Sequence, residues 1–332
     1  ISLFGSSVVG HAMIWYVTLK STENTGANMT ALILATMLPQ VLISFFSGAW
    51  ADRHNRKKIV IFSDLFVALV TLGLAVLFLL GKVSFPIIIV GATLRSIGGG
   101  LQAPASTALY PQLVPSDELT RILGINQSIS SVMQLLAPAL GGVLLTFGLQ
   151  FAFFTDVVTA LVAIFILLFL KIPTIVNQQA SDSVIRNILD GLRYTFNNKI
   201  IRDIIIYYGI VFFLITPCAF LTPLQIKNNF GPDVWRLSLM EMVWVGGSML
   251  GGVYISIKKE FERKNLVLSV CAVAFGLLFG LLGVPISFWL YTSIITVSGI
   301  FMPLLSTVSY VAVQEQTEEH MMGRVMSLIQ II

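Results

Sequence analysis

The sequence predicts an all-α integral membrane protein, and three observations support this fold class. Hydrophobic residues make up 56% of the 332 residues and charged residues only 11%, whereas an average soluble domain has about 25% charged residues. The charges are clustered, which leaves runs such as 59–80 and 151–170 almost free of them. Each run has about 20 residues, enough for a helix to cross a hydrocarbon core of about 30 Å. Lipid offers backbone groups no hydrogen-bond partners, so these runs are expected to be helices.

Ten such spans are predicted along the chain, and an eleventh begins near Gly323. The first apolar run includes Ile1 and has no basic flank, so we expect a span without its start rather than a cleaved signal peptide. Cys218 and Cys271 lie in separate apolar runs and indicate neither a disulfide nor a metal site. The predicted spans are 1–19, 29–50, 59–81, 85–108, 122–147, 151–170, 202–225, 237–257, 265–283 and 286–312.

The basic residues predict how the chain is oriented in the membrane. Most of the 20 lysines and arginines fall in alternate loops, and the loops between them hold only Lys20, Lys82, Lys227 and Arg236. The richer side is predicted to be cytoplasmic, because basic residues are retained on that side. The net charge of +4 therefore reports topology and gives no indication of nucleic-acid binding.

The longest polar stretch divides the chain into two halves. We predict an N-terminal transmembrane bundle at 1–172, a cytoplasmic linker at 173–201 and an incomplete C-terminal transmembrane bundle at 202–332. The linker carries an apolar stripe at helical spacing, which fits either an amphipathic helix on the membrane surface or a solvated helical linker. Glycine followed by basic residues occurs at equivalent places in the two halves, as in many secondary transporters with internal repeats.

A charged turn between the second and third spans gives the most specific motif. Gly48, Asp52, Arg53, Arg56 and Lys57 have the spacing G-x-x-x-D-R-x-x-R-K. This pattern resembles the signature of the major facilitator superfamily, in which glycine stands where this chain has asparagine. Asparagine tolerates a left-handed backbone, so we expect the tight turn to be kept at position 55.

The turn is interpreted as a cytoplasmic gate. The resemblance implies that Asp52 faces the positive N-terminal end of a helix in the other half, while Arg53 and Arg56 hold carboxylates or helix ends. This latch would stabilise the state closed to the cytoplasm. The alternative is that the basic residues, Lys57 in particular, only anchor topology.

Two weaker motifs point to the drug:proton antiporter branch of that superfamily. Arg95 begins an R-x-x-x-G segment in the fourth span. The fifth span matches the antiporter packing pattern at Gly124, Pro138, Gly141 and Gly142, and departs from it at two other positions. The longer strings DRHNRKKI, LVPSDELTRILGINQS and GRVMSLI resemble bacterial macrolide-efflux transporters. The resemblance implies twelve spans, a monomer, the bacterial inner membrane, and proton-driven export of lipophilic compounds without a bound cofactor.

Ionisable side chains at membrane depth are the candidates for proton coupling. We select Arg95 in the fourth span, Asp156 in the sixth and Glu241 in the eighth, because a carboxylate in such surroundings can exchange a proton. The alternatives are structural: a partner that fixes helix packing for Arg95, and stabilisation at a helix N-terminus for the two acids. Asp64 lies in the first turns of the third span beside Arg53 and Arg56, so a structural salt bridge is expected, with proton coupling as the alternative.

Substrate recognition is less clearly indicated. We expect an apolar cavity that contains a few hydrogen-bonding groups. The candidates to line it are Gln102, Gln134, Phe154 and Trp244. A lysophospholipid or lipid facilitator, and a nutrient symporter, remain alternatives on the same fold. A membrane enzyme is disfavoured because no histidine has metal-ligand or nucleophile–base spacing, and no phosphate-binding loop motif is present. A non-transporting receptor would be expected to carry long soluble extensions.

Overall fold

The computed structural model describes residues 1–21, 23–109, 113, 118–170, 184–258, 261, 263–318, 321–322 and 325–326. Within these ranges, side chains are described except at 45–46, 48–53, 119–120, 123 and 184–189. The linker before Val184 and the expected start of an eleventh span near Gly323 lie outside the described residues.

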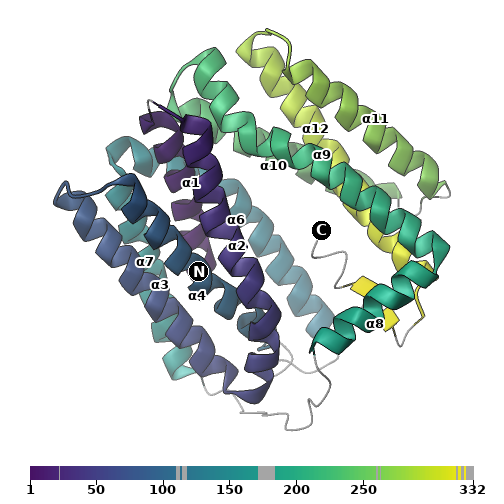
Figure 1. Ribbon diagram of the computed structural model, residues 1–332, viewed down its shortest axis with the longest axis horizontal. Helices are drawn as coiled ribbons and strands as arrows, with labels where there is room; N and C mark the ends of the chain where they lie inside the picture. The colour runs from purple at the N-terminus through teal and green to yellow at the C-terminus, as the bar shows by residue number, and fades with distance from the viewer. Residues whose placement is uncertain are drawn as a thin grey trace. The chain divides into compact units, whose positions relative to one another are not determined.

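In the described ranges the regular structure is helical, which confirms the predicted fold class (Figure 1). Ten of these helices are long and apolar enough to cross a membrane. A further helix, α8, occupies the segment where a linker helix was expected. The helices are α1 (Ser2–Lys20), α2 (Thr25–Arg53), α3 (Arg56–Leu79), α4 (Phe85–Thr107), α6 (Leu119–Phe147), α7 (Leu149–Phe169), α8 (Val184–Asn197), α9 (Lys199–Phe230), α10 (Val234–Lys258), α11 (Lys264–Leu282) and α12 (Phe288–Gln316).

Local sequence explains several helix ends. Gly148 is the single residue between α6 and α7 and has φ of 128°, a conformation that glycine adopts without the penalty a side chain would impose. Pro86 lies in the first turn of α4, where its missing N–H costs no hydrogen bond. Asn198 caps α9 by accepting from the N–H groups of Ile200 and Ile201, which satisfies donors that the helix leaves free.

The chain forms two compact units. The first comprises Ile1–Ser181 and Pro232–Ser238, and the second comprises Asp182–Gly231 and Leu239–Ile332. In the first unit, α1 packs against α2, α6 and α7, while α3 packs against α4 and α7. Val8, Val9 and Ala12 of α1 are fully buried in the core of this unit. This central position of α1 brings its serines close to charged groups on neighbouring helices.

The second unit is built around α9, α11 and α12. Helix α12 packs against both α9 and α11, and α8 packs against α9. Leu305 and Val308 of α12 are buried in this core with Phe275 of α11. Many outward side chains of both units are exposed apolar residues, as expected for helices that face lipid.

Candidate functional site

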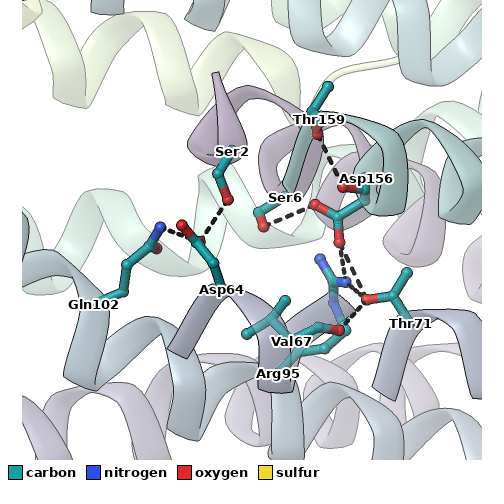
Figure 2. Close-up of polar contacts among 9 residues, drawn as sticks. All are labelled: Ser2, Ser6, Asp64, Val67, Thr71, Arg95, Gln102, Asp156 and Thr159. Carbon is teal, nitrogen blue, oxygen red and sulfur yellow. Dashed lines mark hydrogen bonds and ion pairs between the residues drawn. The ribbon is translucent and has the colours of Figure 1, made fainter. Parts of the chain in front are cut away.

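A buried ion pair joins two helices of the first unit. Arg95 of α4 donates from Nη1 to Oδ2 of Asp156 on α7 (Figure 2). Asp156 is 0% exposed, and the Arg95 side chain is 10% exposed. The structure therefore brings together two residues that sequence analysis selected separately, 61 positions apart.

Hydroxyl groups complete the surroundings of Asp156. Ser6 of α1 donates to its Oδ1 at 3.0 Å. The Thr71 hydroxyl of α3 lies 3.1 Å from its Oδ2 and 2.7 Å from Val67 O, and it accepts a hydrogen bond from Arg95. Side chains from four helices thus meet at one carboxylate. Burying a charge is costly unless it is paired and fully hydrogen-bonded. The ion pair and the hydroxyl hydrogen bonds together offset the cost of burying Asp156 and Arg95.

The approach of α1 to α7 at this point depends on Gly5. A Cβ placed there would lie 2.8 Å from the Cα of Asp156, closer than real atoms pack. Glycine therefore lets α1 come near enough for the neighbouring Ser6 to reach the carboxylate. Neither Gly5 nor the hydroxyls of Ser6 and Thr71 were singled out from sequence, because small polar residues are common in membrane helices.

A second carboxylate is buried nearby. Asp64 of α3 is 3% exposed and accepts hydrogen bonds at Oδ1 from Ser2 at 2.7 Å and from Gln102 at 2.5 Å. The expected salt bridge to Arg56 is not made, since the Arg56 guanidinium donates to Ala108 O at 2.7 Å. Asp64 is eight positions further along α3, about 12 Å along the helix axis, which accounts for the difference. The Arg53 side chain lies outside the described residues.

The guanidinium of the ion pair and the second buried carboxylate border one cavity of about 240 Å³ in the first unit. Arg95, Asp64 and Gln102 line it together with Thr36 and Gln40. Its walls come from α1, α2, α3 and α4, and it contains both carboxylate and guanidinium chemistry at membrane depth. This cavity and the adjoining ion pair form the candidate functional site.

The second unit has a smaller cavity of about 80 Å³. Glu241 and Trp244 of α10 both line it, as does Phe279. The Trp244 and Phe279 rings are near parallel, with centroids 6.5 Å apart. The other two cavity candidates lie elsewhere: Gln134 is exposed on α6, and Phe154 packs against the core of the first unit.

The charged turn is built differently from expectation at its centre. Asn55 has φ of −67° and ψ of 105°, an extended conformation rather than a left-handed one. Its side chain accepts from Lys58 N at 3.2 Å, so it acts as the N-cap of α3. Asparagine is among the best residues for that role, which explains how it can stand where the family has glycine.

Two basic residues of the motif, Arg56 and Lys57, bind helix ends. Arg56 donates to Ala108 O, at the C-terminal end of α4. Lys57 donates to Leu168 O at 3.2 Å and to Leu170 O at 2.8 Å, at the C-terminal end of α7. Helix C-termini carry unpaired carbonyls and partial negative charge, so both contacts are favourable. The side chains of Asp52 and Arg53 and the surroundings of Gly48 lie outside the described residues, and the latch stays a prediction.

The glycine motif of the fifth span has two close contacts and one open position. A Cβ at Gly141 would lie 3.1 Å from Val8 O of α1, whereas one at Gly124 would meet nothing within 4 Å. A Cβ at Gly142 would overlap the Ser238 hydroxyl of α10 and lie 3.4 Å from the Trp15 ring, and Pro138 lies inside α6. The C-terminal part of the motif therefore supports packing of α6 on α1.

A second set of close glycine contacts, in the second unit, was missed. Gly247 and Gly251 of α10 face α12: a Cβ at Gly251 would be 2.7 Å from Pro303 Cγ, and one at Gly247 would be 3.3 Å from Gly299 Cα. Ser248 adds a hydrogen bond to Gly299 O at 3.1 Å. The signal was available in the sequence, since Gly247 and Gly251 form G-x-x-x-G in an apolar span, a helix-packing motif.

The ten membrane-length helices in the described part of the chain define a multi-pass membrane protein. The family model of the Major Facilitator Superfamily matches residues 1–332. The chain belongs to that superfamily. Its family and its relatives identify it as a transporter rather than an enzyme.

Curated relatives and solved structures are consistent with this assignment. Macrolide efflux protein A of Streptococcus pyogenes is 26% identical over 333 residues, covering 99% of this chain and 82% of the relative. Macrolide efflux protein A of Enterococcus faecalis is 26% identical over 307 residues, covering 91% and 95%. A crystal structure of the nucleoside transporter NupG aligns with a TM-score of 0.71 at 16% identity, covering 99% of this chain and 84% of that one. The structural likeness shows the fold alone.

Proposed function

We propose that this protein exports lipophilic, macrolide-like compounds in exchange for protons, as a monomer in the bacterial cytoplasmic membrane. The substrate class is supported by the macrolide efflux relatives, which match nearly the whole chain. Proton coupling is supported by one observation above all, the buried pair of Arg95 and Asp156 beside a polar cavity.

The pair offers a simple coupling step. A proton that binds Asp156 removes the negative charge opposite Arg95 and leaves a buried cation without its partner. The guanidinium and the hydroxyls of Ser6 and Thr71 must then rearrange, and these groups belong to α1, α3 and α4. A change of charge at one carboxylate is thereby coupled to the packing of several helices, which is what an alternating-access transporter requires.

Transport in proteoliposomes tests the proposal. Purified protein would be given a pH jump, and movement of a radiolabelled macrolide and of a lysophospholipid would be followed in parallel. We expect the pH gradient to drive macrolide movement and leave the lysophospholipid unmoved. Movement of the lysophospholipid alone would support a lipid facilitator and contradict the proposal.

Variants locate the coupling group. Asp156→Asn is expected to abolish the response to the pH gradient, because the carboxamide cannot take up or release the proton. Asp203→Asn is the matched control, since Asp203 is an exposed acid paired with Arg202. Unaltered coupling in Asp156→Asn would exclude Asp156 as the proton carrier, and Glu241→Gln would then be the next variant to examine.

A further inference from the structure

The two buried carboxylates of the first unit differ in how their oxygens are used. Asp156 uses both: Oδ1 accepts from Ser6, and Oδ2 accepts from Arg95. Asp64 accepts both of its hydrogen bonds at Oδ1, from Ser2 and Gln102, and Figure 2 shows its second oxygen without a partner among the residues drawn. Both donors to Asp64 are neutral, and in the described part of the chain no lysine or arginine side chain forms an ion pair with it.

The charges around the cavity do not cancel. Arg95 faces it from α4 but is already paired with Asp156, which also exerts a like-charge effect on Asp64. Helix α2 contributes only the neutral polar groups Thr36 and Gln40 to the wall. Counting the adjoining Asp156 together with the two lining charges, Asp64 and Arg95, the site carries one excess negative charge, and the Asp64 side chain that bears it is buried. A buried carboxylate of this kind is strongly stabilised by a cation that brings its own hydrogen-bond donor.

The cavity sets the size of that cation. About 240 Å³ is below the 300–1,000 Å³ that drug-sized ligands commonly occupy, so it has room for a headgroup rather than a whole lipophilic molecule. Val67 and Ala92 provide apolar wall beside the polar groups, which suits the methyl groups of an alkylamine. A metal ion is less well matched, because in the described residues no group of three or more His, Cys, Asp or Glu side chains is placed to hold one.

We propose that Oδ2 of Asp64 binds the protonated amine of a lipophilic substrate, and that this cavity is the amine subsite of the transporter. The inference deepens the proposed export function and rests on it for its biological meaning. The ammonium N–H donates to Oδ2, and the alkyl groups of the amine contact the apolar wall. Gln102 and Ser2 hold the carboxylate in place through Oδ1.

Binding to the purified full chain tests the subsite without relying on transport. The probes are benzyldimethylamine, which is protonated at pH 7.5, and isobutylbenzene, its uncharged carbon isostere. Dissociation constants would be measured in detergent by ligand-observed NMR. The wild-type protein is expected to bind the amine at least about tenfold more tightly, the range of a charge-assisted hydrogen bond to a buried group. Equal binding of the two probes would overturn the proposal without the need for any variant.

Variants then assign the preference to Asp64. Asp64→Asn keeps the shape of the side chain and is expected to weaken amine binding about tenfold or more, with isobutylbenzene changed less than about twofold. Asp64→Glu is expected to retain the preference, because it restores the charge. Asp203→Asn removes an exposed acid and should behave as wild type. If Asp64→Asn binds the amine as well as wild type does, or loses both probes equally, the proposal is wrong.

The two proposals fail in different ways. If wild-type protein moves no macrolide under a pH gradient but still prefers the amine through Asp64, the export function is contradicted and the subsite remains. If macrolide transport is coupled to protons but the amine preference is absent, the subsite is contradicted. In that case Asp64 is a proton-binding or structural group.

Discussion

At the residue scale, the candidate site shows what sequence can and cannot indicate about buried charge. Arg95 and Asp156 were identified because ionisable residues at membrane depth are rare and costly. Their pairing was not predictable, since it depends on which faces of α4 and α7 meet. The same limit applies to Asp64, whose partners Ser2 and Gln102 replace the expected arginine.

The buried pair gives a prediction about stability. Removing one partner leaves an uncompensated charge, so Asp156→Asn is expected to lower the free energy of unfolding by about 3–5 kcal/mol. Replacing both partners by apolar residues, as in Arg95→Met with Asp156→Leu, is expected to restore most of that stability without restoring pH-driven transport. Thermal unfolding in detergent measures the first effect, and proteoliposome transport measures the second. A double variant as unstable as the single one would contradict the view that the unpaired charge is the cause.

At the element scale, helix existence followed from sequence better than helix contacts did. The predicted span 85–108 corresponds to α4 (Phe85–Thr107), and 59–81 corresponds to α3 (Arg56–Leu79), because the need to satisfy the backbone in lipid makes an apolar run of this length helical. By contrast, α9 (Lys199–Phe230) extends beyond the predicted 202–225 at both ends. Hydropathy marks only the apolar part of a helix, and the polar turns at each end depend on caps such as Asn198.

The contact between α10 and α12 gives a prediction with a control on the same helix. Gly251→Ala would place a methyl group against Pro303 and the backbone of α12, so we expect a loss of about 1–3 kcal/mol of stability from overpacking. Gly252→Ala is the control, because a Cβ there meets nothing within 4 Å, and alanine favours a helix by up to about 1 kcal/mol over glycine. Melting temperatures of the two variants are compared with wild type in the same detergent, and we expect only Gly251→Ala to melt at a lower temperature. Equal shifts would show that the close contact does not govern stability.

The basic turn gives a second prediction at this scale. Lys57→Met removes the donor from the carbonyls of Leu168 and Leu170, so the last turn of α7 should open more often. We expect faster amide hydrogen exchange over 166–170 and a loss of about 1 kcal/mol of stability. Lys58→Met is the matched control, since this neighbouring side chain is exposed. Unchanged amide hydrogen exchange in Lys57→Met would show that Lys57 does not stabilise the end of α7 and serves only to set membrane topology.

At the scale of the whole molecule, membrane orientation decides whether the charged turn can be a cytoplasmic gate. The prediction rests on the unequal distribution of lysine and arginine between alternate loops. Helix α3 has 24 residues, about 36 Å at 1.5 Å per residue, so its two ends must lie on opposite membrane faces. The turn before Arg56 and the loop after Leu79 therefore report orientation independently of how the two units are arranged.

Cysteine labelling from each side of the membrane tests this orientation. In a Cys218→Ser background, Lys58→Cys and Lys82→Cys each place a thiol at an exposed position, near opposite ends of α3. A membrane-impermeant maleimide is expected to label Lys82→Cys in right-side-out vesicles and Lys58→Cys only in inside-out vesicles. The reverse pattern would place the charged turn outside the cell. The gate interpretation of Asp52, Arg53, Arg56 and Lys57 would then have to be abandoned, because a turn on that face cannot close the cytoplasmic entrance.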